Sequence, residues 1–435
     1  MTVHSLDSAT SVTDLLTLLP PLGREGALVR FRFGGHERIL VNDLDSVHAV
    51  LANSDQEMRQ SPASGPALRV MGDGLLTTRA AERWRPRRIL IQRELAPSRI
   101  TSYAPLIASN TDNMIDSWGV GSEVSIRDAI LTLALDNLGD SLFGSDFREF
   151  RSTVRTALDL MVELFDQAET GRVDIEAQES LEEAIDRLEQ FVEAIVARRE
   201  DNRSSRRFVV DVLIEAAQSD SPVFRDPFLR DEAVTLLMAG HDTVAFLMIM
   251  CLYLVNRDPE VRRRIAQEYE DASRAGVSAE EMPDRLPYAR AAAQETLRLF
   301  PPLPFFNRTA TEGLVLDGQK IEPGTLLMVS PWIIHRDERL FPVPEAFDPG
   351  RFSPERRGLI PKGAYFPFGH GQRVCAGNHF ALMQCVLVIS KLASRVEFEL
   401  DSTADAQIHC PVTLKFTEPV LATISTIRGS QPSLH

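Results

Sequence analysis

Cysteine is scarce in this 435-residue chain, which contains four such residues. Cys251, Cys375, Cys385 and Cys410 form no Cys-x-x-Cys pair, and their spacings match no zinc-binding pattern. A cytosolic chain of this size is not expected to form disulfides. The default interpretation of each cysteine is therefore a buried free thiol.

Positive charge and long apolar runs are also in short supply. With 47 Lys and Arg against 62 Asp and Glu, the formal net charge is −15, whereas nucleic-acid-binding proteins need a basic surface to neutralise phosphates. The first twenty residues lack both the basic region of a signal peptide and the roughly 20 apolar residues of a membrane span. Residues 244–255, the most apolar stretch elsewhere, are too short to span. We expect a cytoplasmic protein with neither a nucleic-acid nor a membrane partner.

Linkers, repeats and low-complexity tracts are absent as well. Length alone suggests two or three domains, but no Pro-, Gly- or Ser-rich segment divides the chain. Its composition, 44% hydrophobic and 25% charged, suits one large core. We predict a single domain over residues 1–435, in which the N-terminal segment 1–25 is the least defined.

Helical periodicity dominates the pattern. Residues 103–273 show it almost throughout, with a solvated, charge-rich face at 179–201, and residues 62–78 are rich enough in Gly, Pro and Ser to predict a loop. The other predicted elements are a hairpin of 28–33 with 38–41, helices at 43–51, 80–95, 231–255, 286–300 and 378–393, and strands at 314–316, 326–329 and 412–414. We predict a mainly α fold with small β-sheets, an α+β protein.

The most informative segment is 368–377, Phe-Gly-His-Gly-Gln-Arg-Val-Cys-Ala-Gly. Two glycines ahead of Cys375 permit a tight turn, and Gly377 lets the next helix lie close to a flat group. A position just before a helix N-terminus stabilises a thiolate, by roughly 0.3–1 kcal/mol when exposed, and lowers the thiol pKa. Such a thiolate is a good ligand for iron, and Arg373 offers a cation to a carboxylate.

This pattern, Phe-x-x-Gly-x-Arg-x-Cys-x-Gly, resembles the haem-binding loop of the cytochrome P450 family at all five specified positions. The resemblance implies haem b (iron protoporphyrin IX), with Cys375 as the axial iron ligand and Phe368 and Gly377 beside the cofactor. It extends from about Leu28 to the C-terminus and implies the single-domain cytochrome P450 fold.

The resemblance also implies donors for the two haem propionates. Trp84 and Arg88 match the family's Trp-x-x-x-Arg, and Arg308 and Arg373 match two further donors. Trp84 taken alone would be interpreted as a core residue. His335 matches a family position too, but we interpret it as a structural histidine.

A Glu-x-x-Arg pair, Glu295 and Arg298, lies on one face of a predicted helix, and Arg351 follows 53 residues after Arg298. These positions resemble the family's buried Glu-Arg-Arg network, which implies a structural role in supporting the haem loop. The alternative is an exposed ion pair, which would contribute little stability.

Residues 239–243, Ala-Gly-His-Asp-Thr, interrupt an apolar helix. An interior Gly costs about 1 kcal/mol relative to Ala and an unpaired carboxylate is expensive there, so we expect a distorted helix. The segment resembles the family's oxygen-activating groove. That resemblance implies that Ala239 lies over the haem, Gly240 opens the helix over the iron, Thr243 hydrogen-bonds oxygen and Asp242 relays protons. A purely structural helix is the alternative.

The substrate pocket is implied by the resemblance alone, and its apolar lining suits a mid-sized hydrophobic molecule. The residues expected to line it are Leu75, Leu76, Thr235, Met238, Leu303, Phe306, Asn307 and Val412.

No Gly-x-Gly-x-x-Gly motif follows a predicted strand, so we expect electrons from a separate ferredoxin and ferredoxin reductase. Five arginines on or near helix 80–95 form either a docking site for an acidic ferredoxin or a solvated face: Arg83, Arg85, Arg87, Arg93 and Arg99. The resemblance implies a monomeric monooxygenase that uses O2 in secondary metabolism, usually for hydroxylation. Two alternatives stay open, namely oxidative coupling or cyclisation without net oxygen insertion, and a haem-based ligand sensor without turnover.

Overall fold

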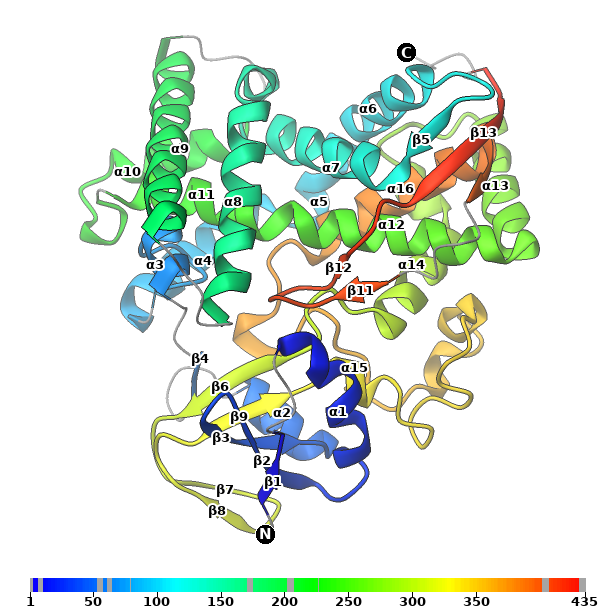
Figure 1. Cartoon of the computed structure of the whole chain (residues 1–435). Helices are drawn as coiled ribbons and strands as arrows, with labels where there is room; N and C mark the ends of the chain where they lie inside the picture. Colours follow the sequence, from blue (N-terminus) through cyan, green and yellow to red (C-terminus); the bar gives the residue numbers. More distant parts are fainter. Residues whose placement is uncertain are drawn as a thin grey trace.

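The structure is a computed structural model that describes residues 3–6, 11–52, 58–60, 65–78, 80–169, 175–201, 207–225, 227–400 and 407–429. Helices make up most of it (Figure 1). In chain order they are α1 (Leu15–Leu22), α2 (Leu44–Ala52), α3 (Gly65–Met71), α4 (Ala81–Glu94), α5 (Pro97–Ile100), α6 (Ala104–Asp116), α7 (Ile126–Leu142), α8 (Arg151–Glu169), α9 (Ile175–Asp201), α10 (Val209–Ala217), α11 (Phe228–Gly240), α12 (Asp242–Arg257), α13 (Pro259–Arg274), α14 (Pro287–Leu299), α15 (Pro331–Ile334) and α16 (Asn378–Arg395).

Two apolar helices, α12 and α16, form the centre of the molecule. Every residue of α12 from Val244 to Leu252 is buried, and α16 is buried over most of its length. A helix that is apolar all round needs neighbours on every side, and α12 packs on α7, α14 and α16. Figure 1 shows α12 crossing the middle of the molecule.

The stretch Phe228–Arg257, which comprises α11 and α12, is long and apolar enough to cross a membrane. However, 67% of its most apolar window is buried inside the protein. Its environment is therefore that of a core helix.

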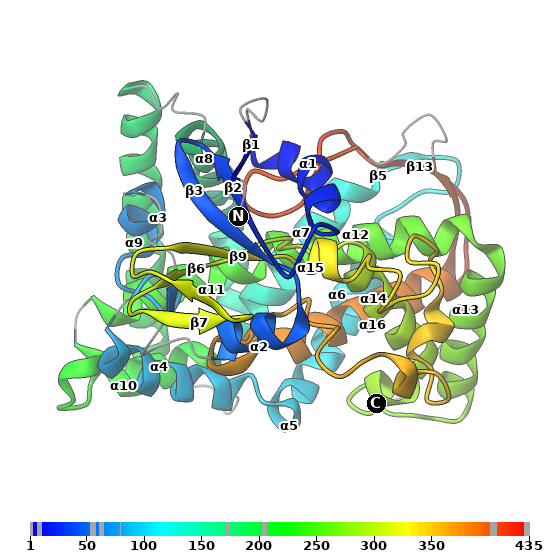
Figure 2. The same cartoon turned by 90° about the horizontal axis from the view of Figure 1, so that it is seen from below.

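Small sheets lie at the margins of this helical bulk. The largest has the strand order β1-β2-β3-β9-β6-β4 and lies at one edge of the molecule, beside α2 (Figures 1 and 2). Its strands are β1 (Val3–Ser5), β2 (Leu28–Phe33), β3 (His36–Val41), β4 (Met58–Gln60), β6 (Phe306–Ala310) and β9 (Leu326–Val329). The smaller sheets are β10 (Val396–Leu400) with β13 (Leu421–Ile427) and β5 (Glu123–Ser125), β7 (Leu314–Leu316) with β8 (Gln319–Ile321), and β11 (Ile408–His409) with β12 (Lys415–Phe416).

The predicted hairpin is present, with Phe33 paired to His36. Its two turn residues, Gly34 and Gly35, have φ of +58° and +77°, as a two-residue turn of this hand requires. The fold is mainly α with small β-sheets in a single domain, which confirms the predicted class.

Two local predictions are wrong. Part of the segment predicted as a loop, 62–78, forms α3, while residues 61–64 lie outside the described part of the chain. The predicted strand 412–414 is instead the connection between β11 and β12. Leu414 donates its N–H to the carbonyl of Pro302 at 2.8 Å, so its backbone bonds outside the β11–β12 ladder.

Candidate active site

The loop that precedes α16 folds back on itself. Cys375 donates its N–H to the carbonyl of Phe368 at 2.9 Å, which closes the predicted turn. Gly369 and Gly371 have φ of +76° and +72°, a region that other residues avoid. A Cβ on Gly371 would also lie 2.7 Å from the carbonyl oxygen of Leu51. Backbone conformation and close contact with α2 both require glycine at this position.

The side chain of Cys375 is accessible although protein atoms lie close around it. Its side chain is exposed, yet burial raises the pKa of the thiol, while the backbone N–H of Gly377 and the charge of Arg88 act in the opposite direction. An exposed side chain and a desolvated thiol are compatible if protein surrounds the sulfur on most sides and leaves one side accessible. The net rise corrects the expectation of a lowered thiol pKa, because desolvation outweighs the two favourable contacts.

Helix α4 is attached to this loop by the predicted propionate donors. The Arg373 guanidinium lies 3.9 Å from the centre of the Trp84 ring, a cation–π contact, and Arg88 Nη2 donates to the carbonyl of Val374 at 2.5 Å. Trp84 and Arg88 are both buried. Within the described residues, the buried Nε of Arg88 has no hydrogen-bond partner. Arg88 therefore holds a spare N–H donor beside the Cys375 loop.

Strand β6 carries Arg308 to the same region. Because side chains alternate along a strand, Phe306 and Arg308 face one side of β6 and Asn307 faces the other. A Cβ on Gly369 would lie 3.7 Å from the Phe306 ring, so this face is directed towards the Cys375 loop. Phe306 packs against the loop and is half-buried.

The helix is broken where the sequence predicts distortion. α11 ends at Gly240 and α12 begins at Asp242, with His241 between them. The Thr243 hydroxyl donates to the carbonyl of Ala239 at 2.9 Å, a local bond that competes with the helical ladder and favours bending.

One stripe of this helix is uncovered although the helix lies in the core. Ala239 is exposed, and Leu236, Gly240 and Thr243 are half-buried, at the i, i+3, i+4 and i+7 spacing of a single helix face. A Cβ on Gly240 would lie 2.9 Å from Leu138 of α7. Packing against α7 is thus a reason for glycine that the sequence did not suggest.

The uncovered stripe and the Cys375 loop flank the same apolar cluster. Leu236 from α11 and Ala376 from the loop both pack against it. The cluster includes Leu75, Trp84 and Phe228. The Cys375 loop and the uncovered helix face are therefore both in contact with one apolar cluster.

The carboxylate of Asp242 is held from two sides. Its Oδ1 lies 3.0 Å from His241 Nδ1, and its Oδ2 lies 2.5 Å from Lys415 Nζ. Burial alone would raise the pKa of Asp242, but the hydrogen bonds and charges of His241 and Lys415 outweigh it and hold the pKa well below its ordinary value. Lys415 comes from β12, and no motif in the sequence pointed to it.

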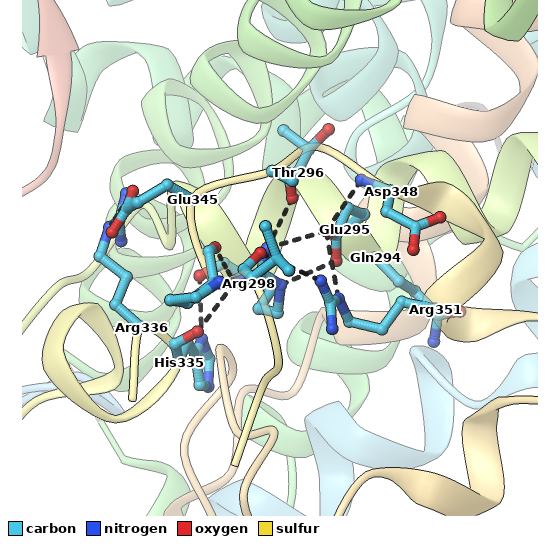
Figure 3. Close-up of polar contacts among 12 residues, drawn as sticks. Gln294, Glu295, Thr296, Arg298, His335, Arg336, Glu345, Asp348 and Arg351 are labelled. Atoms are coloured by element: carbon cyan, nitrogen blue, oxygen red, sulfur yellow. Dashed lines mark hydrogen bonds and ion pairs between the residues drawn. The ribbon is translucent and has the colours of Figure 1, made fainter. Parts of the chain in front are cut away.

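A buried ion network lies behind the loop (Figure 3). Arg298 donates to both carboxylate oxygens of Glu295 at 2.8 Å, and both side chains are fully buried. Arg351 Nε makes a single longer contact of 3.4 Å with Glu295 Oε1. The remaining Arg298 donors reach the carbonyls of His335, Pro344 and Ala346 at 2.8, 2.7 and 3.0 Å. The pair is thus buried and not the exposed ion pair that the sequence also allowed.

His335 connects this network to the Cys375 loop. Its Nδ1 lies 3.2 Å from the carbonyl oxygen of Arg298, and its Nε2 accepts the N–H of Phe366 at 3.0 Å. Burial, assisted by the Arg298 charge, lowers the pKa of His335 to about 3. The imidazole is therefore neutral near pH 7 and links the network to the backbone just before Phe368.

The residues expected in the substrate pocket separate into covered and uncovered groups. Thr235 and Leu75 are buried, and a Cβ on Gly74 would lie 2.1 Å from Thr235 Oγ1, so loop backbone covers that hydroxyl. The more accessible residues are Leu76, Met238, Leu303, Phe306, Asn307 and Val412. Of the two adjacent leucines, Leu75 is covered and Leu76 is 42% exposed.

The basic group on α4 is smaller than the sequence suggests. Arg87, only 4% exposed, points inwards and is not part of the surface. Two others are paired with acids at 2.8 Å, Arg83 with Asp73 and Arg99 with Glu94. Arg85 and Arg93 are exposed on α4.

The arrangement fits the haem that the loop motif implies. A haem site needs an accessible thiol, cationic donors for carboxylates, and an uncovered wall on the oxygen side. Cys375, the spare N–H of Arg88 and the uncovered stripe at Ala239 meet these requirements.

Comparison with known proteins agrees with this geometry. The model of the family described as Cytochrome P450 matches residues 23–419. Cyclooctatin synthase of Streptomyces melanosporofaciens is 30% identical over 403 residues, covering 90% of this chain and 86% of that protein. Cyclooctat-9-en-7-ol 5-monooxygenase of the same organism is 27% identical over 391 residues, covering 87% and 84%. A putative cytochrome P450 132 of Mycobacterium bovis is 25% identical over 418 residues, covering 90% and 88%. This chain therefore belongs to the cytochrome P450 family of haem-dependent monooxygenases.

Proposed function

We propose that Cys375 is the axial ligand of a haem b iron and that this chain oxidises a mid-sized hydrophobic molecule with O2 and external electrons. The observation that carries the proposal is the Cys375 side chain, which lies in the glycine turn before α16, is accessible, and has Arg88 beside it. Haem, when bound, supplies the reductive activation of O2. Arg88, Arg308 and Arg373, with Trp84, would hold its propionates.

The residues at the helix break would manage protons. The Thr243 hydroxyl lies on the uncovered stripe, one residue from Asp242, whose carboxylate is ionised and bonded to Lys415. A hydroxyl beside an ionised carboxylate that is partly open to solvent can hand protons inwards one at a time. Asp242, held by His241 and Lys415, would orient the solvent that relays protons, and Thr243 would orient the acceptor.

The substrate class follows from the lining. Of the accessible residues expected in the pocket, Asn307 is polar and the others are apolar, which suits a hydrophobic molecule; the apolar ones are Leu76, Met238, Leu303, Phe306 and Val412. The names of two relatives, Cyclooctatin synthase and Cyclooctat-9-en-7-ol 5-monooxygenase, support a place in secondary metabolism. Electrons would come from a ferredoxin and its reductase, with Arg85 and Arg93 on the docking face. A monomeric cytoplasmic protein is part of the same proposal.

The test is the absorption spectrum of the purified, dithionite-reduced protein under carbon monoxide. A Soret band shifted strongly to the red is expected, because it would report thiolate ligation of the iron by Cys375. A band at the position of neutral nitrogen ligation would contradict the role of Cys375. Absence of haem from the purified protein, even after reconstitution, would contradict the function as a whole.

A further inference from the structure

Loop 72–78, between α3 and α4, is seated on the first turns of α11 through its backbone. Asp73 donates its N–H to Asp231 Oδ2 at 2.7 Å, and Leu75 donates its N–H to Glu232 Oε2 at 3.1 Å. Two consecutive carboxylates of one helix thus accept two N–H groups of one loop. Asp231 is 2% exposed and Glu232 is 0% exposed.

Glycine allows this close approach. Gly72 has φ of +53°, and a Cβ there would lie 2.2 Å from Asp231 Oδ1. A Cβ on Gly74 would lie 2.8 Å from the carbonyl oxygen of Asp231. The loop backbone therefore contacts the helix directly at positions where a side chain does not fit.

Arg87 of α4 closes the seat from the other side. Its Nη1 donates to the carbonyl of Asp73 at 2.5 Å and lies 3.6 Å from Glu232 Oε1. Its Nε and Nη2 donate to the carbonyl of Val223 at 3.1 and 3.0 Å. Among the described residues, Glu232 Oε1 has no hydrogen-bond partner. A buried carboxylate with one unfilled oxygen costs stability and indicates a role beyond packing.

We propose that Glu232, with Asp231 and Arg87, is a positioning residue that seats loop 72–78 and thereby fixes Leu76 at the edge of the substrate pocket. The inference rests on the proposed function, because that function makes Leu76 a pocket residue. Leu75 packs in the cluster around Trp84, whereas Leu76 is 42% exposed. Lifting the loop displaces Leu76 while the glycine turn that holds Cys375 stays in place.

The seat is also linked to protons. Three charged groups act on Glu232 from the elements packed against it: Arg87, Asp73 and Asp231. Asp73 is in turn paired with Arg83, and Asp231 with Arg230. Burial raises the pKa of Glu232 to about 7, although the Leu75 N–H and the Arg87 charge both act to lower it. Lifting the loop admits water and lowers this pKa towards its ordinary 4.5. Because the seated state has the higher pKa, seating takes up a proton between about pH 4.5 and 7 and weakens as pH rises through that range.

Hydrogen–deuterium exchange of the haem-loaded ferric protein tests the seat directly. Glu232→Ala removes the acceptor of the Leu75 N–H, so the opening constant of loop 72–78 rises by about tenfold. In the unaltered protein this constant, corrected for intrinsic exchange, rises between about pH 4.5 and 7 by up to about tenfold per pH unit and is flat above pH 7. Glu232→Gln keeps an acceptor oxygen and cannot ionise, so its profile is flat.

Glu268→Ala is the matched control. Glu268 of α13 is half-buried and accepts the N–H groups of Tyr288 and Ala289 at 2.8 and 3.0 Å. Its loss therefore removes the same kind of carboxylate–backbone contact in a different place. We expect Glu268→Ala to leave the hydrogen–deuterium exchange of loop 72–78 unchanged.

Two azoles give a second measurement through the Soret shift. Imidazole occupies the iron and little more, whereas 4-phenylimidazole extends towards the pocket edge. Glu232→Ala weakens the binding of 4-phenylimidazole severalfold relative to the binding of imidazole, and Glu268→Ala does not. The proposal would be overturned if Glu232→Ala changed the affinity for both azoles equally or left exchange of loop 72–78 unchanged. It would also be overturned if the opening constant still rose with pH in Glu232→Gln. The carbon monoxide band is recorded in each variant as well. If the red-shifted band is present while the loop measurements fail, the further inference is wrong and the proposed function stands.

Discussion

Replacing Glu295 by Gln tests the buried network that supports the Cys375 loop. The substitution removes the negative charge beside Arg298, whose side chain is fully buried, and turns an amide N–H₂ towards its guanidinium. Removing one partner of a buried ion pair costs about 3–5 kcal/mol, because the other charge remains uncompensated. We expect Glu295→Gln to lower the free energy of unfolding by that amount and to weaken haem retention.

The assay is urea unfolding of the haem-loaded protein, followed by far-ultraviolet circular dichroism and by Soret absorbance. Glu260→Gln is the control, because Glu260 and Arg263 have the same residue types, the same i, i+3 spacing and the same bidentate contact, but are 62% and 64% exposed. Solvent screens that pair, so no measurable shift of the midpoint is expected. Equal midpoints for the two variants would refute the reasoning that burial gives the Glu295 pair its importance.

Four further outcomes follow. Cys375→Ser leaves a folded protein without the red-shifted carbon monoxide band, and retention of that band would remove Cys375 as the ligand. Thr243→Ala keeps haem but diverts electrons to hydrogen peroxide, measured as peroxide formed per NADH with a surrogate ferredoxin and reductase; unchanged coupling would contradict its role. Lys415→Met removes one group that lowers the Asp242 pKa. A depressed acid pKa stabilises the fold above the unfolded value and loses this effect as pH falls, so the variant is less stable at pH 7 and shows a flatter loss below pH 4. His335 is neutral in the fold with a pKa of about 3, so its protonation favours the unfolded chain and the stability of the fold falls as pH decreases from 6.5 to 3. His335→Gln removes that part of the pH profile, measured as urea midpoints at several pH values.

Local signals in the sequence predicted the elements that a local rule controls. The Gly34-Gly35 turn, the boundaries of α4 and α14, and the distortion around His241 follow from glycine freedom, apolar spacing and the cost of an interior carboxylate. The failures lie where a distant contact decides. Leu414 bonds to Pro302 and leaves the ladder, and burial, which depends on the whole fold, outweighs the helix end in setting the thiol pKa of Cys375.

By itself, the sequence determined the family, the mainly helical class and the candidate iron ligand, because these depend on a short motif and on residue periodicity. Only the tertiary structure decided which charges meet. It turned Arg87 inwards, brought Lys415 to Asp242 across 173 positions, and seated a glycine loop on Glu232. The physical reason is that an ion pair depends on the distance between two side chains in space, and sequence separation carries no measure of that distance.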